Sequence, residues 1–368
     1  MNIFVFGTRG IPNIQGGVEK HCEELYSAMP ENIFFTLFRR KPFLNNDVLN
    51  RQYKQIRFID LPSTKIQGFE SFFHSFLAAL YCIFHQSDIV HVHNIGPGIF
   101  IPLLKLFRQK VVLTYHSANY EHKKWNRFAR IILKAGEKFA LTGANAVIFV
   151  NKEQLKKSNK EIQKKSYYIP NGVKFTERSE QTDYLKKCGL TPQKYILAVG
   201  RITPEKGFDY LIDAFLSLQD KNYKLVIAGG VDHKTSYSKK IYENTQEQDR
   251  VVMTGFVSGE ELRQLYSYSK LFVLPSYNEG FPLVLLEAMN YKLNVLASDI
   301  SAAKAMKLPM NSYFKAGDKE NLSQKLRQQL AEPYSLIDYN LSEYKWENIA
   351  IQTTEIYQQV VNNSHQTQ

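Results

Sequence analysis

Short apolar runs alternate with longer amphipathic segments along almost the whole chain. Several of the runs are apolar throughout, which is typical of strands that are covered on both faces. Between them, apolar residues recur at helical spacing. This alternation predicts an α/β fold of parallel sheets with crossover helices on both faces. The predicted strands are 2–7, 33–38, 56–61, 88–94, 110–117, 146–150, 195–200, 224–230, 251–256, 271–276 and 294–299, and the predicted helices are 18–29, 69–85, 121–141, 207–218, 259–268 and 282–291.

The strands fall into two groups, separated by the polar segment 167–194, which has no periodicity. A chain of 368 residues has room for two such sheets. We therefore expect two Rossmann-like, doubly wound domains, at 1–172 and 173–344, facing a cleft. Sheets of this kind bind ligands beyond the carboxyl ends of their strands, so residues that follow strands are the candidate site residues.

The most apolar stretch, 68–86, is shorter than a membrane span and carries Glu70 and His74. Helical spacing predicts a core helix here, and the alternative is an amphipathic helix that leans on a membrane. The residues at this spacing are Phe69, Phe72, Phe73, Phe76, Leu77, Leu80 and Phe84.

The formal net charge of +12 attracts polyanions: nucleic acid, anionic membrane or phosphorylated small molecules. Basic residues concentrate at 122–139 and 152–165, which indicates docking onto anionic lipid or, alternatively, an ordinary solvated face. No nucleic-acid module accompanies the charge. Three well-separated cysteines indicate reduced thiols in the cytoplasm, and the strand-like run at 2–7 leads us to expect no signal peptide.

A pair of cations follows one strand of the second half. The run 195–200 leads directly into Arg201, and Lys206 precedes a helix whose apolar stripe starts at Phe208. Cations beside a helix N-terminus stabilise phosphate groups. These residues indicate a phosphate or diphosphate site, although either cation alone would also fit a solvated loop.

Two glutamates, Glu279 and Glu287, flank a helix start in "SYNEGFPLVLLEAM". Pro282 suits the first helical position, which places Glu287 about one and a half turns inside. A carboxylate on a mostly apolar helix needs a partner, and ribose hydroxyls can donate to its oxygens. Glu279 would accept from other sugar hydroxyls, and the amides of Gly280 and Phe281 would reach ligand oxygens. The alternative for Glu287 is a surface residue whose apolar neighbours face the other way.

Gly16 and Gly17 lead into the first long helix. Glycine there lets backbone N–H groups approach an oxyanion, and the alternative is a plain turn. The glycine spacing does not match GxGxxG, and strand 33–38 leads into Arg39 and Arg40 where a dinucleotide fold would place an acidic residue. The pattern argues against NAD.

Histidines lie at the ends of two further strands. His116 ends one strand, where it can carry a proton or donate a hydrogen bond to a sugar. His91 and His93 share one face of another strand. A zinc site would fit such residues, but no HExxH or CxxC accompanies them. We predict no metal and interpret His91 as structural.

Four segments in this order, "DIVHVHN", "YIPNGV", "VGRITPEKG" and "NEGFPLVLLEAM", resemble the retaining glycosyltransferases of family 4, which have the two-domain GT-B fold. The resemblance spans nearly the whole chain. The segment 7–25 resembles a bacterial subgroup that transfers rhamnose and related sugars into surface polysaccharides. The segment 344–357 resembles the family's C-terminal helix, which implies that about 345–368 packs back onto the first domain.

The resemblance implies how the donor is bound. Arg201 and Lys206 would hold its diphosphate, and Gly16 and Gly17 would face that group from the other domain. Glu287 would bind the ribose of the nucleotide.

The resemblance also implies which groups surround the transferred sugar. Glu279 would bind it, aided by the backbone around Gly280, Phe281 and Pro282, and His116 would match the family's histidine in the cleft. The rhamnosyl subgroup tends to carry an Asp-Gly pair where this chain has His116 and Ser117, which leaves the donor sugar open.

Together these features predict a metal-independent glycosyltransferase with no cofactor. It would move a sugar from a UDP, dTDP or GDP donor to a glycan or lipid-linked acceptor, in bacterial capsule, O-antigen or exopolysaccharide synthesis. We expect a cytoplasmic protein that is peripheral at the inner face of the cell membrane. The alternatives are a sugar-nucleotide 2-epimerase on the same fold, a non-catalytic sugar-nucleotide-binding subunit, and a basic nucleic-acid-binding protein.

Overall fold

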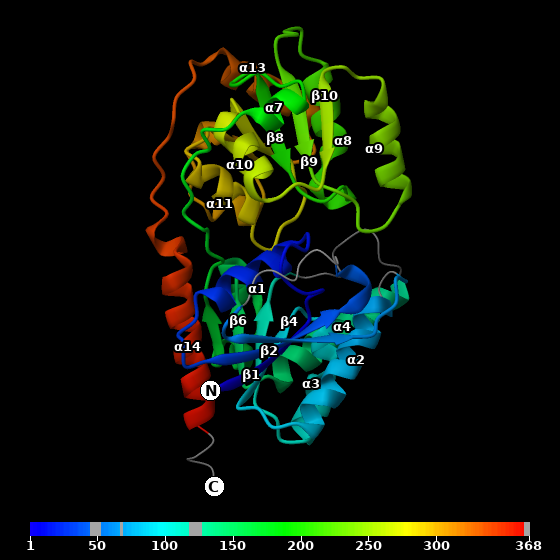
Figure 1. The fold of residues 1–368 in the computed structure, drawn as a ribbon, viewed down its shortest axis with the longest axis vertical. Coiled ribbons are helices and arrows are strands. Elements are labelled where there is room, and N and C mark those ends of the chain that lie inside the picture. The colour runs from blue at the N-terminus through cyan, green and yellow to red at the C-terminus, as the bar shows by residue number, and fades with distance from the viewer. Residues whose placement is uncertain (45–52, 67–68, 118–126, 364–368) are drawn as a thin grey trace. The chain divides into compact units, whose positions relative to one another are not determined.

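The chain divides into two compact units (Figure 1). The first joins residues 1–172 with 343–368, and the second holds 173–342, so the division falls after Gly172. Each unit is described by itself. The computed structural model describes residues 1–44, 53–66, 69–117 and 127–363.

A seven-stranded parallel sheet forms the first unit, in the order β3-β2-β1-β4-β5-β6-β7. The strand order reverses between β1 and β4, and the carboxyl ends of strands at such a reversal are where α/β sheets bind ligands. The strands are β1 Asn2–Phe6, β2 Phe34–Arg40, β3 Ile56–Leu61, β4 Ile89–His93, β5 Val111–Tyr115, β6 Ala146–Phe149 and β7 Ser166–Tyr168.

Two hydrophobic cores cover the two faces of this sheet. Alternation along β1 sends Ile3 and Val5 into one core and Phe4 and Phe6 into the other. Helices α1 and α14 supply the first core, and α2, α3 and α4 supply the second. The helices are α1 Gly17–Ser27, α2 Phe69–Phe84, α3 Ile101–Leu106, α4 Arg127–Gly143, α5 Lys152–Lys157, α6 Lys160–Gln163 and α14 Trp346–Asn362.

The side of helix α2 that faces the sheet carries small and polar residues. Small side chains there let the helix approach the strands closely. The predicted helix is confirmed, but the interpretation of its phenylalanines as a buried core stripe is wrong for Phe69, Phe72, Phe76 and Phe84, which are exposed. In the part of the chain that the structure describes, no helix has the length and apolar character needed to cross a bilayer. The buried residues of α2 are Glu70, His74, Ser75, Ala78, Ala79 and Cys82.

A six-stranded parallel sheet forms the second unit, in the order β10-β9-β8-β11-β12-β13. Here the order reverses between β8 and β11. The strands are β8 Tyr195–Val199, β9 Lys224–Ala228, β10 Val251–Gly255, β11 Leu271–Leu274, β12 Val295–Ser298 and β13 Tyr313–Phe314. The helices are α7 Asp183–Lys187, α8 Phe208–Leu216, α9 Ser236–Gln246, α10 Gly259–Tyr268, α11 Leu283–Asn290, α12 Ser301–Lys304 and α13 Lys319–Ala331.

The elements that sequence patterns did not predict are short or polar. Strands β7 and β13 have three and two residues. Helices α9 and α13 bury few of their side chains, so their apolar stripe is weak. The first part of the helix predicted at 121–141 lies outside the described residues, and α4 extends from Arg127 to Gly143.

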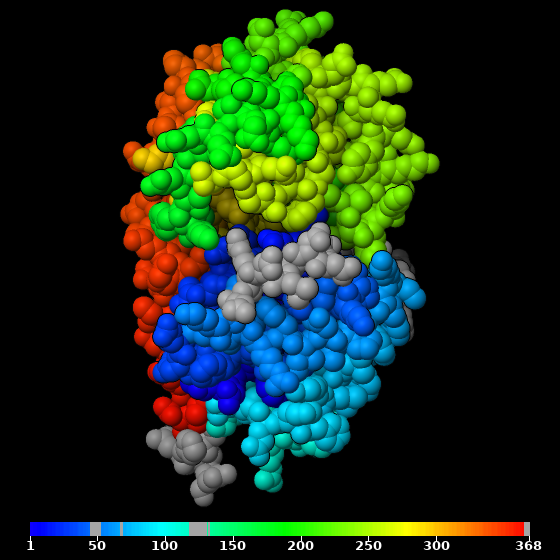
Figure 2. Space-filling view, in the orientation of Figure 1, coloured from blue at the N-terminus to red at the C-terminus, as the bar shows by residue number. Residues whose placement is uncertain are grey.

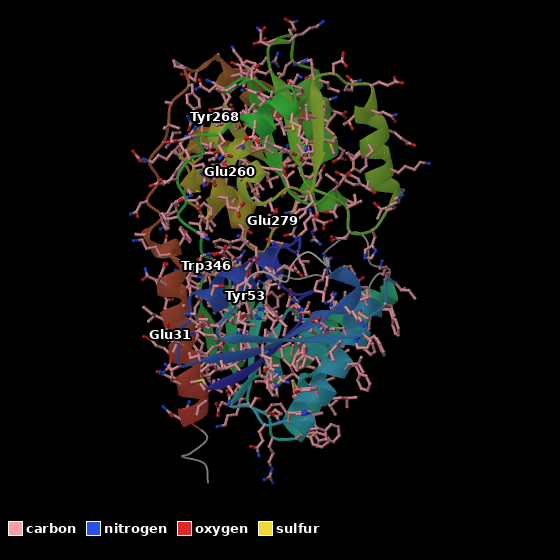
Figure 3. The ribbon with its side chains drawn as sticks, viewed as in Figure 1. Glu31, Tyr53, Glu260, Tyr268, Glu279 and Trp346 are labelled. Atoms are coloured by element: carbon pink, nitrogen blue, oxygen red, sulfur yellow. The ribbon has the colours of Figure 1, made fainter. Side chains whose placement is uncertain are left out.

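Helix α14 returns the end of the chain to the first unit. Trp346, labelled in Figure 3 near the start of this helix, is buried against the backbone of Gly172 and the ring of His21. A Cβ atom at residue 172 would lie 2.6 Å from the indole, so only glycine leaves room for the tryptophan. The glycine in "YIPNGV" is therefore explained by packing.

We expect Trp346→Ala to lower the free energy of unfolding by about 3–5 kcal/mol, because it removes a large buried side chain and leaves a cavity. Ile351→Ala is the matched control on the same helix: Ile351 is exposed, so its loss should cost less than about 0.5 kcal/mol. Urea unfolding followed by circular dichroism measures both, and equal losses would contradict the packing role of Trp346.

Candidate functional site

The loop after β8 brings Lys206 back over the end of its own strand. Residues 204–206 form a 3-10 turn, and Gly207, with φ of 65°, leads into α8, which begins one residue after the predicted start. A Cβ atom at Gly207 would lie 2.3 Å from the carbonyl oxygen of Pro275, so this glycine lets the loop pack on the end of β11. The methylene groups of Lys206 lie over Gly200. The loop is thus held at the strand reversal.

Each of the two predicted cations contacts a carboxylate. Lys206 Nζ lies 2.6 Å from Glu279 Oε1, and the two side chains are only 17% and 11% exposed. Ser276 donates a hydrogen bond to the same Glu279 oxygen at 2.7 Å. Arg201 donates to Asp232 Oδ2 at 2.8 Å. The structure therefore brings Lys206 and Glu279 together as a half-buried ion pair at the carboxyl ends of β8 and β11.

The loop 276–281 that carries Glu279 (labelled in Figure 3) is anchored on both sides. The amide of Tyr277 donates to the carbonyl oxygen of Glu205 at 2.8 Å, and Ser298 donates to that of Ser276 at 2.6 Å. Helix α11 begins at Leu283, so Pro282 is its N-cap residue and not, as predicted, its first helical residue. Gly280 and Phe281 lie in this loop, immediately before the helix.

Glu287 is half-buried on α11, and the protein itself supplies one partner for its carboxylate. Tyr266, fully buried on α10, donates to Glu287 Oε2 at 2.9 Å. Burial and the neighbouring Glu287 carboxylate raise the pKa of Tyr266, so the phenol stays protonated. The protein thus supplies one of the hydrogen bonds of this carboxylate, in addition to those predicted from a ribose. Sequence reasoning missed Tyr266, because nothing in a helical pattern marks a tyrosine as a donor.

In the first unit, Glu19 organises the loop between β1 and α1. Its Oε1 accepts from Thr8 Oγ1 at 3.3 Å and from the amide of Arg9 at 3.0 Å. A Cβ atom at Gly16, which has φ of 150°, would lie 1.9 Å from the other Glu19 oxygen. Helix α1 begins at Gly17, and its N-cap residue is Gly16, which has no side chain to cap the first turn. Glu19 was not predicted, although it lies only two residues after Gly17.

His116 belongs to a buried group of histidines next to the carboxyl ends of β4 and β5. His116 Nε2 lies 3.0 Å from His93 Nδ1, and the His21 ring packs edge-on against His116 with ring centroids 4.8 Å apart. His21 Nδ1 is 2.8 Å from Asn171 Oδ1. Of these residues only His116 and His93 were singled out from the sequence; His21 comes from α1 and carries no motif that marks it.

Hydrogen bonds extend this group as far as α14. Tyr26 Oη lies 2.6 Å from His93 Nε2 and 3.1 Å from His91 Nδ1, which is itself 2.6 Å from Tyr357 Oη. His91 Nε2 lies 2.7 Å from Thr114 Oγ1. His91 is thus a hydrogen-bonded structural histidine.

Burial keeps these imidazoles uncharged. It lowers the pKa of His21 to about 4 and that of His91 to about 3, and it holds the pKa values of His93 and His116 well below the usual range. A neutral imidazole accepts at one nitrogen and donates at the other, so the network can polarise a hydroxyl but carries no fixed positive charge.

Among the residues that the structure describes, His21, His93 and His116 form a group that could hold a metal ion. One nitrogen from each lies within 4.8 Å of the others, and all three residues are buried. Neutral imidazoles are the form that binds metals. The contact of 3.0 Å between His93 and His116 has the length of a hydrogen bond, however, so the geometry shown is that of a hydrogen-bonded network.

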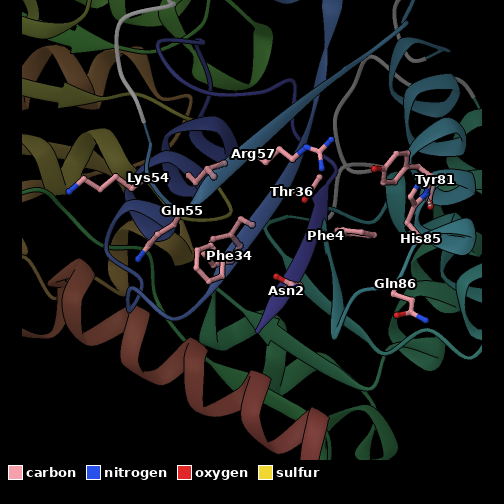
Figure 4. Close-up of a pocket in the computed structure, with 12 residues that line it drawn as sticks. Asn2, Phe4, Phe34, Thr36, Lys54, Gln55, Arg57, Tyr81, His85 and Gln86 are labelled. Carbon is pink, nitrogen blue, oxygen red and sulfur yellow. Dashed lines mark hydrogen bonds between the residues drawn. The ribbon is translucent and has the colours of Figure 1, made fainter.

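A hollow of about 520 Å³ lies elsewhere in the first unit (Figure 4). It opens between the amino-terminal parts of β1, β2 and β3 and the end of α2, with Asn2, Phe34, Ile56 and His85 in its wall. The candidate residues lie at the other ends of the strands. We therefore assign the site to the carboxyl ends, where the polar groups converge, and not to this hollow.

Acid should destabilise the first unit before the second. Below about pH 6.5 the histidines of the unfolded chain bind protons, whereas the buried histidines of the folded protein stay neutral down to their lower pKa values. Each such histidine therefore lowers the free energy of unfolding by about 1.4 kcal/mol for every pH unit in this range. His21, His74, His91, His93 and His116 all lie in the first unit and are buried, whereas the second unit contains only His233.

Fluorescence can isolate this effect, because both tryptophans belong to the first unit's part of the chain. In a Trp125→Phe variant, Trp346 alone reports on that unit. We expect its urea midpoint to fall markedly between about pH 7.5 and about pH 5. An unchanged midpoint would contradict the assignment of neutral, buried histidines.

Comparison with known proteins places both units in one class. The model of "Glycosyltransferase Family 4" matches residues 15–177, and that of "Glycosyl transferases group 1" matches 180–345. Among curated relatives, a putative teichuronic acid biosynthesis glycosyltransferase of Bacillus subtilis is 28% identical over 229 residues, which cover 60% of this chain and 55% of that protein. The matched regions span about half to three fifths of the first curated relatives.

Solved structures match over nearly the full length. Sucrose-phosphate synthase from Thermosynechococcus elongatus has a TM-score of 0.81 at 22% identity, covering 98% of this chain and 99% of that one. The Anabaena protein HepE, solved with UDP-glucose, has a TM-score of 0.72 at 16% identity and covers 99% of each chain. These likenesses show the fold. The two family models together match both units, at 15–177 and 180–345. The protein therefore belongs to the family 4 glycosyltransferases and has the GT-B fold.

Proposed function

We propose that this protein is a retaining glycosyltransferase that moves a hexose from a nucleotide-diphosphate-sugar to a hydroxyl of a glycan or lipid-linked acceptor, in the assembly of a bacterial surface polysaccharide. The observation that carries the proposal is the Lys206–Glu279 ion pair at the strand reversal of the second sheet. The biosynthetic role is supported by the curated relative that is named for teichuronic acid biosynthesis.

Lys206 and Arg201 supply the positive charge for the donor diphosphate in this proposal. Both are held at the carboxyl end of β8, each by a carboxylate, Glu279 or Asp232. An arriving diphosphate replaces these carboxylates as the partner of the cations. Because both cations then already contact the diphosphate, little further reorganisation is needed when negative charge develops on the leaving group.

Glu279 changes partner in the same step. Once Lys206 turns to the diphosphate, the Glu279 carboxylate accepts hydrogen bonds from hydroxyls of the transferred sugar, with Ser276 still donating to it. The backbone of Gly280, Phe281 and Pro282 adjoins this position. Glu287 accepts from the ribose hydroxyls while Tyr266 fixes its carboxylate.

The first unit contributes neutral groups. Gly16 and Gly17 open α1, and because the N-cap residue Gly16 has no side chain, the amides of the first turn suit an oxyanion such as the donor phosphate. His116, neutral and oriented through His93, donates a hydrogen bond to a sugar hydroxyl.

The reaction breaks the bond between the anomeric carbon and the diphosphate oxygen and forms a bond from that carbon to the acceptor oxygen. The electron pair of the broken bond stays on the diphosphate, and the acceptor's proton passes to a phosphate oxygen on the same face of the sugar. Attack from that face retains the anomeric configuration. In this proposal side-chain cations stabilise the leaving group, with no metal ion or cofactor.

Nucleotide-sugars should raise the thermal stability of the protein, because a ligand that binds only the folded state stabilises it. A thermal-shift screen with UDP-, dTDP-, GDP- and ADP-sugars identifies the base. We expect one base to raise the melting temperature at concentrations well above its Kd. No shift with any nucleotide-sugar would contradict the proposal.

Lys206→Ala should lower kcat for sugar transfer by about 100- to 1,000-fold, because the leaving diphosphate loses a preorganised cation. Lys239→Ala is the matched control: Lys239 lies on α9 of the same unit and pairs with Glu243 at the surface, so transfer should be unchanged. Labelled donor with a cell-envelope acceptor extract gives the readout. Undiminished transfer by the double variant Lys206→Ala, Glu287→Ala would refute both assignments.

Acceptor dependence separates the alternatives. Product formed from the donor alone would identify an epimerase, and donor binding without turnover in any acceptor extract would identify a non-catalytic subunit. Each result overturns the transferase assignment.

A further inference from the structure

Helix α2 presents a row of aromatic side chains away from the core. Phe69, Phe72, Phe76 and Phe84 are all exposed, Phe84 by 78%. Phe72 and Phe76 pack partly against Phe100, with ring centroids 5.1 and 5.8 Å apart, which fixes their side of the helix. Contiguous exposed apolar surface on a protein marks an interaction site.

Helices α3 and α4 continue this surface. Leu106 is 76% exposed at the end of α3, Phe107 follows it, and Ile131 and Phe139 are exposed on α4. We call the exposed apolar residues of α2, α3 and α4, with Phe107, the aromatic face. The stretch of chain that contains α2 and α3 is drawn in light blue to cyan in Figures 1 and 2.

Close packing joins the three helices into one surface. A Cβ atom on Gly98 would lie 2.6 Å from the Cβ of Ala140, and one on Gly143 would lie 2.9 Å from Ile101 Cγ2. These glycines therefore let α4 lie directly against α3 and the turn that precedes it. The three helices link β3 to β4, β4 to β5 and β5 to β6, so all run from the carboxyl to the amino ends of the strands.

The charges beside the aromatic face have one sign. Arg108, Lys134 and Lys138 are exposed. Across 69–84, 101–108 and 127–143 the sequence has two carboxylates, and both are engaged inside the protein. Glu70 is buried near Arg40, and Glu137 accepts from Tyr115 Oη at 2.5 Å. Within the described residues of these three helices, the surface is thus aromatic and cationic without an exposed acidic group.

The second basic segment differs. Residues 152–165 form α5 and α6, where Lys156 pairs with Glu153 at 2.8 Å and Lys164 with Glu161 at 2.7 Å. These two exposed pairs lie within a helix or beside it, and they engage two of the six lysines of the segment. Among the described residues 152–165 no large apolar side chain is exposed, so this segment lacks the apolar part of the aromatic face and fits an ordinary solvated surface better.

We infer that the aromatic face of α2, α3 and α4 lies on an anionic lipid bilayer, with its phenylalanines in the headgroup boundary and its lysines and arginines among the phosphates. Aromatic residues combined with cations, without acids, are typical of helices that lie in a membrane interface. Interfaces between proteins are depleted in lysine, and a second copy of the chain would bring cation against cation. Lipid therefore fits this surface best.

The inference concerns the first unit alone and does not depend on the donor site, so its test needs no substrate. Purified protein is sedimented with vesicles of phosphatidylcholine, with or without phosphatidylglycerol. We expect binding to the vesicles that contain phosphatidylglycerol and much weaker binding to phosphatidylcholine alone. No binding to the anionic vesicles would overturn the inference.

Replacing apolar side chains by serine tests the role of the aromatic face. Phe84→Ser with Leu106→Ser should weaken binding at least about tenfold, because both side chains lose the apolar contact with lipid. Both are almost fully exposed, so the fold should be retained, which circular dichroism checks. Met310→Ser, an 87% exposed position in the second unit, is the control and should bind as the parent does. Equal binding by the double variant would overturn the inference.

Charge reversals distinguish binding through this face from binding through the net positive charge of the whole protein. Lys134→Glu with Lys138→Glu on α4 should weaken binding to anionic vesicles about 30-fold or more. Lys156→Glu with Lys164→Glu makes the same change in net charge on α5 and beside α6, and should leave most of the binding intact. Equal weakening by both pairs would show binding through net charge alone and would overturn the assignment of the face.

Discussion

The ion pair between Lys206 and Glu279 is the contact on which the chemistry of the second unit depends. It joins two loops at the strands where the sheet changes direction, and both loops are shaped by contacts that leave little freedom. Gly207 gives one loop its close approach to Pro275, and Ser276 holds the carboxylate from the other. An ion pair this little exposed keeps a cation ready for an anionic ligand, at the cost of a competing carboxylate that the ligand must displace.

The candidate residues of the first unit differ from the Lys206–Glu279 pair because they are uncharged. At the carboxyl ends of β4 and β5, buried neutral imidazoles, linked through Tyr26 and Tyr357, place hydrogen-bonding groups without charge. The aromatic face lies on three helices that cover the sheet face opposite α1 and α14, so the proposed lipid-binding surface is separate from the face of the sheet that those two helices cover.

Sequence patterns predicted most of the strands and the long helices, because parallel strands covered on both faces are apolar throughout. Sequence patterns could not show which side chains contact one another. Arg201, Lys206 and Glu279 follow strands, and their spacing indicated the site, but the pairing of Lys206 with Glu279 and of Arg201 with Asp232 depends on how the loops fold. Periodicity also misjudged α2: its spacing marks an amphipathic helix but not which side faces the sheet, and the small residues Ala78, Ala79 and Cys82 occupy the core. Tyr266, Glu19 and His21 carry no signal in one sequence, since their roles come from contacts across helices and loops.

Titration calorimetry of a sugar-free nucleoside diphosphate tests the central contact most directly. In wild type the diphosphate must displace Glu279 from Lys206. We predict that Lys206→Met weakens binding at least about tenfold, that Glu279→Gln leaves binding as tight or tighter because the competing carboxylate is gone, and that the effects are not additive in the double variant. Equal affinity in all four proteins, or a loss of affinity in Glu279→Gln as large as in Lys206→Met, would contradict the account.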